Sequence, residues 1–301
     1  MKDGWFVQNF YWHLLFVYLV FVAFATMLAL VRRWVKPSSS PSNVWKKYPI
    51  YLLLNLAFFL AILLPRDWHS VSLLVAVIGG CASWELSRAL GLTKIERVVL
   101  PAITAGLILS TDWLQPISFV KIWLVIMLAS IATGGLISRP ENLGRRILGF
   151  VACLGYLSLC LATFIWISQT NTGFFGTIFV YGVIATNDAF AQIVGQLIGS
   201  HMLAPRISPS KTTEGTTGGL FFAVLFGVIL SPTVGWTYVH GALIGATLAL
   251  AGLTGDLTVS SWKRALGLKD FSHLLGAHGG VLDRFDAFIF AVPIFFVLSI
   301  R

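Results

Sequence analysis

Charged residues are scarce in this sequence: they make up 11% of its 301 residues, and only 12 residues are acidic. Soluble globular chains carry about 25% charged residues, so the composition excludes an ordinary soluble domain. Hydrophobic residues instead make up 57% of the chain, and the mean hydropathy is +0.84. Because a membrane-crossing helix needs about 20 apolar residues, we expect an all-α fold, a polytopic integral membrane helix bundle.

Cysteine is also rare. The three cysteines, Cys81, Cys153 and Cys160, lie in apolar runs and form no CxxC spacing. A disulfide framework or a cysteine-ligated metal therefore has no support in the sequence. We interpret all three as core or lipid-facing side chains.

Apolar runs recur along the whole chain and predict about ten transmembrane helices, since open sheet edges cannot be satisfied in hydrocarbon. The runs lie near residues 9–31, 48–64, 70–87, 98–111, 120–137, 147–168, 174–197, 217–234, 237–257 and 285–300. The third run holds Glu85 and is followed at once by Arg88, and the fourth is short, which weakens both as spans. We expect one continuous membrane domain, with residues 1–147 as scaffold helices and residues 148–301 as the catalytic region.

The basic residues alternate between loops. Seventeen of the 21 lysines and arginines fall in every second loop between the predicted spans. Cytoplasmic loops carry the excess of Lys and Arg, so this pattern predicts both termini outside and the charged loops in the cytoplasm. It also accounts for the net charge of +9 without a nucleic-acid partner.

Half of the acidic residues are concentrated in the C-terminal part of the chain. They are Asp188, Glu214, Asp256, Asp270, Asp283 and Asp286. In the stretch ATNDAFAQIVGQLIG, Asp188, Gln192 and Gln196 are spaced four residues apart and share one helix face. An ionisable residue inside a span indicates a functional site by default; a lone aspartate bonded within the bundle is the alternative.

A second stretch, APRISPSKTTEGTTGG, leads into the next span. It contains a Ser-Pro turn, Lys211 and a run of threonines and glycines. Free amides at a helix N-terminus favour anions, although the order of residues is not that of a Walker A loop. An ordinary capped loop explains this stretch equally well.

The third stretch runs from Gly255 to Asp286. Asp256, Ser260 and Arg264 share one face of a helix that we expect to extend beyond the membrane. Asp283 and Asp286 begin the last span, where the helix dipole would stabilise them. Capping alone explains neither the neighbouring Lys-Arg pair nor the His-Gly-Gly before the helix.

Together these stretches predict a phosphate-handling site. Carboxylate oxygens suit Mg²⁺, lysines and arginines neutralise phosphate oxygens, and glycines let backbone amides approach closely. Zinc is unfavoured because His273 and His278 have no cysteine partners, and no GxSxG motif indicates a serine hydrolase.

The segment SSWKRALGLKDFSHLLGAHGGVLDRFD resembles the signature of the phosphatidate cytidylyltransferase (CDP-diacylglycerol synthase) family, and LAPRISPSKTTEG resembles the Ser-Pro-x-Lys-Thr loop of that family. The resemblance covers roughly residues 185–290. This chain departs from the family pattern at Val259, where an acidic residue is common, at Gln196, where many members have lysine, and at Trp262, which replaces a small residue.

The resemblance implies transfer of CMP from CTP to phosphatidic acid, giving CDP-diacylglycerol and pyrophosphate at the cytoplasmic face of the inner (plasma) membrane. It implies Mg²⁺ and two cation sites, one of which could hold a monovalent ion. The expected metal ligands are Asp283, Asp256 and Asp188. The expected catalytic residues are Asp283, Lys263, Arg264, Lys269, Asp270, His278 and Arg284. The expected substrate-binding residues are Ser208, Lys211, Thr212, Ser260, Gly279 and Gly280.

Other functions remain open at this point. A transporter would string ionisable residues across several spans near the membrane midplane, whereas here they gather in one half of the chain. A CTP-dependent enzyme acting on another lipid phosphate or lipid alcohol is the nearer alternative. The sequence leaves open whether membrane lipid is the only further partner or whether the protein forms a homodimer.

Overall fold

The computed structural model describes residues 41–64, 69–137, 140–170, 173–276 and 279–299. The chain divides into two units, Met1–Asn55 and Leu56–Arg301. The described part of the first unit, residues 41–55, is the N-terminal stretch of one helix. The predicted first span near residues 9–31 lies outside the described residues, as does His278.

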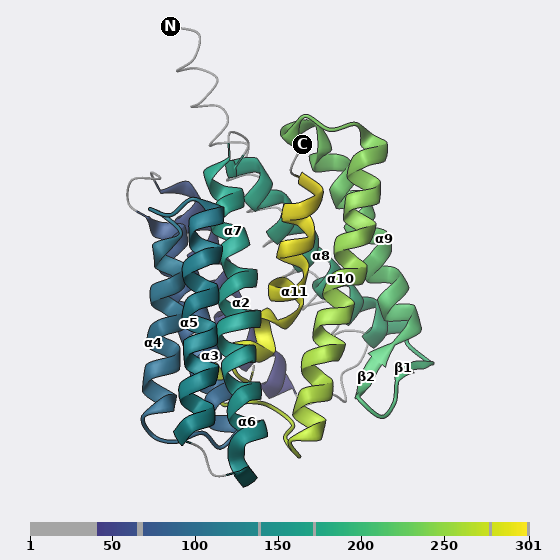
Figure 1. The fold of residues 1–301 in the computed structure, drawn as a ribbon. Helices are drawn as coiled ribbons and strands as arrows, with labels where there is room; N and C mark the ends of the chain where they lie inside the picture. The colour runs from purple at the N-terminus through teal and green to yellow at the C-terminus, as the bar shows by residue number, and fades with distance from the viewer. Residues whose placement is uncertain (1–40, 65–68, 138–139, 171–172, 277–278, 300–301) are drawn as a thin grey trace, which may run out of the picture. The chain divides into compact units, whose positions relative to one another are not determined.

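The described chain is almost entirely helical, as expected (Figure 1). Its helices are α2 (Pro41–Leu63), α3 (Ser70–Ala89), α4 (Glu96–Ser110), α5 (Pro116–Ile137), α6 (Pro140–Phe150), the π-helix η2 (Val151–Ser158), α7 (Leu159–Gln169), α8 (Gly173–Ile198), α9 (Thr213–Leu230), the 3₁₀-helix η3 (Ser231–Val234), α10 (Tyr238–Ala265) and α11 (Leu282–Ser299).

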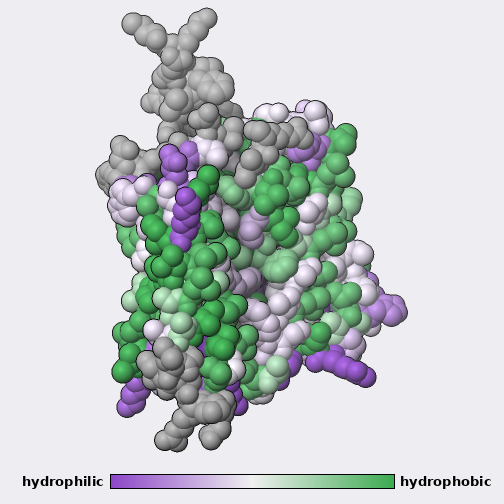
Figure 2. Space-filling model, viewed as in Figure 1, coloured by the Kyte–Doolittle hydropathy of each residue, from purple (hydrophilic) through white to green (hydrophobic). Residues whose placement is uncertain are grey.

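Six helical segments in the described residues are long and apolar enough to cross a membrane. They are Ser70–Ala89, Pro116–Thr133, Asn142–Gln169, Gly173–Ile198, Thr213–Val234 and Tyr238–Ala265. The chain is therefore an integral membrane protein, and a total of about ten spans stays a prediction. Figure 2 shows the apolar side chains covering the flanks of the helices, with hydrophilic residues towards their ends.

Close backbone contacts hold α9 between α8 and α10, which lie beside it in Figure 1. A Cβ atom on Gly227 of α9 would lie 2.5 Å from the carbonyl oxygen of Gly241 on α10. A Cβ atom on Gly219 would lie 2.7 Å from the carbonyl oxygen of Asn187 on α8. Small residues permit this approach where lipid provides no hydrophobic force between helices.

An aromatic cluster packs within the second unit. Phe58 near the end of α2 stacks on Tyr181 of α8 with ring centroids 4.4 Å apart. Its edge contacts reach Phe164 of α7 and Phe288 of α11, at 6.3 Å and 5.7 Å. Such pairs stabilise beyond the area they bury, and here they fix α11 against α7 and α8.

A short antiparallel hairpin, which the apolar pattern did not predict, precedes α9. Strand β1 (Met202–Ala204) pairs with β2 (Ser208–Thr212), with Ala204 opposite Ser208. The chain between the strands contains Pro205, which suits a turn. The hairpin carries the Ser-Pro-x-Lys-Thr segment along one strand, so that Lys211 is held in extended backbone rather than in a loose loop.

Candidate functional site

The predicted polar stretches meet at one end of the helices of the second unit. The C-terminal part of α8, strand β2, the end of α10 and the start of α11 all lie there, and the hairpin marks this end in Figure 1. Residues far apart in sequence thus contribute to one neighbourhood.

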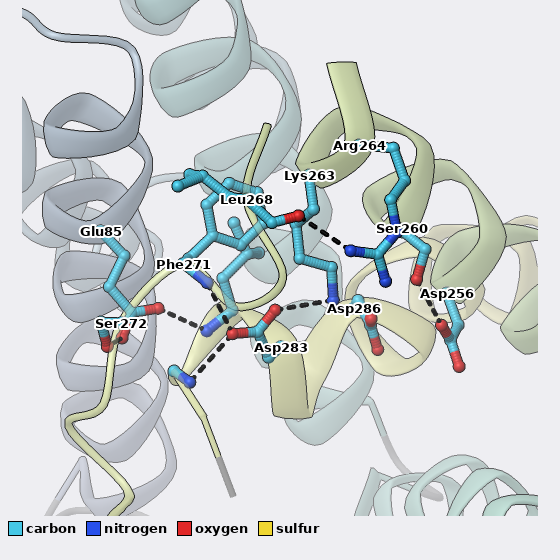
Figure 3. A network of polar contacts seen from close by, with 12 residues as sticks. Glu85, Asp256, Ser260, Lys263, Arg264, Leu268, Phe271, Ser272, Asp283 and Asp286 are labelled. Carbon is cyan, nitrogen blue, oxygen red and sulfur yellow. Dashed lines mark hydrogen bonds and ion pairs between the residues drawn. The ribbon is translucent and has the colours of Figure 1, made fainter. Parts of the chain in front are cut away.

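Lys263 and Asp283 form a buried ion pair. The ammonium group of Lys263 in the last turn of α10 lies 2.8 Å from Oδ1 of Asp283 in the first turn of α11. Their side chains are only 9% and 5% exposed. A cation at a helix C-terminus and an anion at a helix N-terminus each oppose the local dipole charge, so both helix ends stabilise the pair. Figure 3 shows Lys263 reaching to Asp283 from the neighbouring helix.

The second oxygen of Asp283 binds the backbone of the segment between α10 and α11. It accepts hydrogen bonds from the amides of Phe271 and Gly280, both at 2.9 Å. Gly279 has a φ of 82°, which favours glycine, and a Cβ atom there would lie 3.1 Å from the Asp283 carboxylate. Both glycines of the predicted His-Gly-Gly turn therefore shape the backbone around Asp283.

A second lysine-aspartate pair lies between the hairpin and α10. The ammonium group of Lys211 lies 2.6 Å from Oδ2 of Asp256, with side chains 22% and 30% exposed. The hydroxyl of Ser260, one turn further along α10, donates to the other Asp256 oxygen over 3.2 Å. The predicted shared face of Asp256 and Ser260 is confirmed, and this pair is more open to solvent than that of Lys263.

Three aspartates from three helices lie within electrostatic range of one another. Asp188 of α8 is influenced by the charges of Asp256, Lys211 and Arg284. Asp286 of α11 is influenced by Asp256, Asp188 and Lys263, and it is 5% exposed. Among the described residues, only Asp256 of these three aspartates has an ion-pair partner. We call Asp188, Asp256 and Asp286 the acidic trio.

Asp286 was not among the predicted metal ligands, although its position in the first turns of α11 was recognised. Asp283, the leading predicted ligand, directs its oxygens to Lys263 and to two amides instead. Within the described ranges, no group of three or more His, Cys, Asp or Glu side chains stands ready to hold a metal ion.

Arg264 joins the hairpin to the end of α10. Its Nε donates to the carbonyl oxygen of Ile207 over 3.0 Å, and one terminal nitrogen donates to that of Leu268 over 2.9 Å. The guanidinium is exposed and braces two backbone segments; its contact with Leu268 is drawn in Figure 3. Contact of Arg264 with a phosphate stays a prediction.

The remaining predicted residues lie around this centre. Thr212 caps α9, because its hydroxyl oxygen accepts from the amide of Gly215 over 3.1 Å. Ser208 begins β2, and Asp270 lies beside Gly279. Lys269 and Arg284 are exposed.

Glu85 is the residue that sequence reasoning missed. It lies near the end of α3, in the half of the chain predicted to be scaffold, and it is fully buried. Its carboxylate accepts hydrogen bonds from the hydroxyl of Ser272 and from the amides of Val281 and Leu282, the latter two at 2.9 Å and 2.8 Å. A glutamate inside an apolar run was the available signal, since such residues indicate function by default.

Val259, where the family pattern commonly has an acidic residue, is fully buried on α10. It contributes packing rather than charge. The carboxylates of this region lie on other positions: Glu85 on α3, Asp188 on α8, Asp256 on α10, and Asp283 and Asp286 on α11.

The protein is an integral membrane protein that gathers carboxylates, lysines and glycine-shaped backbone at one end of its helices. These features define the class of membrane enzymes that act on phosphorylated substrates. A family model described as the cytidylyltransferase family matches residues 45–300. The chain belongs to this family, whose members are nucleotidyltransferases.

Curated relatives carry a common name. A Bacillus subtilis protein named phosphatidate cytidylyltransferase is 32% identical over 246 residues, which cover 76% of this chain and 88% of that protein. Proteins of the same name from Aquifex aeolicus and Staphylococcus saprophyticus are 39% and 36% identical over 145 and 152 residues. The matched segments span only 54% and 58% of those two proteins.

Proposed function

We propose that this protein transfers CMP from CTP to phosphatidic acid, forming CDP-diacylglycerol and releasing pyrophosphate. Family membership and the shared name of its relatives support the reaction class. The observation that carries the proposal is the pairing of two lysines with two aspartates where α8, α10, α11 and the hairpin meet. Both substrates are anionic phosphates, which a partly exposed lysine such as Lys211 recognises.

The chemistry requires one bond to form and another to break. A phosphate oxygen of phosphatidic acid attacks the α-phosphorus of CTP, the bond from that phosphorus to the bridging oxygen of pyrophosphate breaks, and pyrophosphate leaves with the electron pair. Positioning and charge neutralisation supply most of the catalysis in such displacements. We assign Lys211, which is partly exposed, to the nucleotide phosphates, and Lys263 to holding Asp283 and the start of α11 in place.

A divalent cation such as Mg²⁺ would be held by one or two carboxylates of the acidic trio together with substrate phosphates, because Mg²⁺ commonly takes that ligand set and no group of three such side chains stands ready among the described residues. The donors are carboxylate oxygens, which Mg²⁺ prefers, and only one of the three aspartates is neutralised by a described ion-pair partner. The candidate ligands are Asp188, Asp256 and Asp286, of which one or two would hold the ion, with Asp283 orienting the adjacent turn. When bound, the ion would neutralise charge on the attacking and leaving phosphate oxygens.

The position of the site suits two substrates of different solubility. CTP arrives from water, whereas the phosphate of phosphatidic acid lies at the membrane surface with its tails in lipid. The excess of basic residues in alternate loops supports a cytoplasmic location for this end of the bundle. We propose the inner (plasma) membrane as the membrane that the protein spans.

Product analysis tests the proposal. The detergent-purified protein is mixed with phosphatidic acid, Mg²⁺ and CTP labelled at either the α- or the γ-phosphorus. We expect α-label in a lipid product and γ-label in pyrophosphate. Transfer of γ-label to lipid with release of CDP would identify a lipid kinase and overturn the proposal.

A further inference from the structure

Glu85 and Asp283 hold the same segment from opposite sides. Asp283 accepts hydrogen bonds from the amides of Phe271 and Gly280. Glu85 accepts from the residue that follows each of them, namely from the hydroxyl of Ser272 and the amide of Val281. The two carboxylates thereby fasten the middle and the end of the segment that connects α10 to α11. We call this arrangement the double clasp (Figure 3).

The contact of Glu85 with the start of α11 satisfies amides that no helical carbonyl can reach. The first amides of a helix lack intrahelical partners, and Glu85 accepts from Leu282, the first residue of α11, and from Val281 before it. The acceptor for these amides therefore comes from α3, and Glu85 lies 197 residues before Leu282 in the chain.

The Glu85 carboxylate packs closely against the segment that connects α10 to α11. A Cβ atom on Gly280 would lie 2.6 Å from Oε2 of Glu85, so the glycine is required for the backbone to approach the carboxylate. Only a carboxylate fits this position, because all three groups that face its oxygens are donors. A glutamine would turn a donor towards at least one of them.

We propose that Glu85 is a positioning residue for the transfer reaction: it fixes the start of α11, and with it Asp283 and Asp286, relative to the end of α10. Its carboxylate is occupied by three donors of the protein, so we assign it no contact with substrate. This inference rests on the proposed function, because the reaction that it supports is the transfer of CMP.

The expected consequence of weakening the clasp is a loss of turnover with little loss of CTP binding. Glu85→Gln should lower kcat by about tenfold or more, since a lost hydrogen bond to a charged group corresponds to about that factor. The KM for CTP should change by less than about threefold, because the nucleotide contacts assigned to Lys211 on the hairpin are untouched.

Glu96 provides a matched control. It is also a buried glutamate of the N-terminal half, 8% exposed, and it also accepts three hydrogen bonds, two from Thr93 and one from Arg146. Thr93 precedes α4 and Arg146 lies within α6, and neither residue belongs to the double clasp. Glu96→Gln should therefore lower the unfolding temperature but leave the kcat of the folded protein unchanged.

Hydrogen exchange separates positioning from general stability. In full-length protein in detergent, the amides of Phe271 and of residues 280–282 should exchange faster in Glu85→Gln than in the wild type, and at the wild-type rate in Glu96→Gln. Ser272→Ala removes one donor of the clasp without burying a new group, and it should lower kcat by about threefold to tenfold even if Glu85→Gln folds poorly.

The outcomes are distinct. Slower turnover together with faster exchange at Phe271 and at residues 280–282, seen in the Glu85 and Ser272 variants only, supports the inference. Wild-type kcat in Glu85→Gln or Ser272→Ala, or an equal loss of kcat in Glu96→Gln, overturns it. A wild-type protein that transfers no CMP would instead refute the proposed function, while the exchange measurement would still report whether Glu85 holds the segment.

Discussion

Lys263 and Asp283 join the last turn of α10 to the first turn of α11 through a 2.8 Å contact that is almost entirely shielded from solvent. The pair joins two helices and also shapes the candidate site, because the same aspartate accepts hydrogen bonds from the amides of Phe271 and Gly280. Structural and catalytic roles can be separated by removing its charges singly and together.

Lys263→Met should destabilise the protein strongly, because it leaves a buried carboxylate without its cation, a change that costs about 3–5 kcal/mol. The double variant Lys263→Met/Asp283→Asn should recover much of this stability, since neither charge remains. Thermal unfolding in detergent measures both effects. A double variant that is less stable than Lys263→Met would show that the pair is not the source of the loss.

Asp283→Asn alone should lower stability, because it leaves the buried ammonium group of Lys263 unpaired. The folded variant should also lose at least about 100-fold in turnover, because the carboxylate that orders the turn before α11 is gone. Saturating Mg²⁺ should not restore the rate. The control is Asp112→Asn, which alters an aspartate that pairs with His69 away from the site. Near-wild-type turnover of Asp283→Asn would remove Asp283 from the catalytic assignment.

Lys211→Gln should raise the KM for CTP by about tenfold while changing stability little. Its ion pair with Asp256 is partly exposed, and exposed pairs contribute only about 0–1 kcal/mol. Arg206→Gln removes a positive charge from the turn of the same hairpin and should leave KM unchanged. Equal KM values for the two variants would argue that Lys211 acts only through the general charge of the hairpin.

The proposed orientation predicts which face of the membrane each end of the bundle meets. A cysteine at Arg206 of the hairpin turn should react with a membrane-impermeant maleimide from the cytoplasmic side only. A cysteine at Trp113, which is 72% exposed just after α4, should react from the opposite side. Unsubstituted protein gives the background of the native cysteines. Reaction of both positions from one side would contradict the topology.

The sequence predicted the helices well because apolar runs report directly on burial in lipid. The runs at 174–197 and 237–257 became α8 and α10 with ends shifted by a few residues, and α10 continues to Ala265 as expected from its polar face. The hairpin escaped prediction because its strands of three and five residues are too short for an alternating pattern.

The site was predictable in composition but less so in pairing. Spacing along one helix placed Asp256 and Ser260 together. The sequence could not say which of Lys211 and Lys263 pairs with which aspartate, because the packing of separate elements decides that pairing. Glu85 illustrates the same difficulty: its partners lie 187 to 197 residues away in the sequence, and no local pattern encodes such a distance.

The most direct test of the account measures whether Asp188 and Asp256 act as one unit. Turnover of CTP and phosphatidic acid is measured for Asp188→Asn, for Asp256→Asn and for the double variant, since residues that act together show strongly non-additive losses. The account predicts that each single variant loses about 100-fold or more and that the double variant is within a few-fold of the poorer single. Losses that multiply, or wild-type turnover in either single variant, would contradict it.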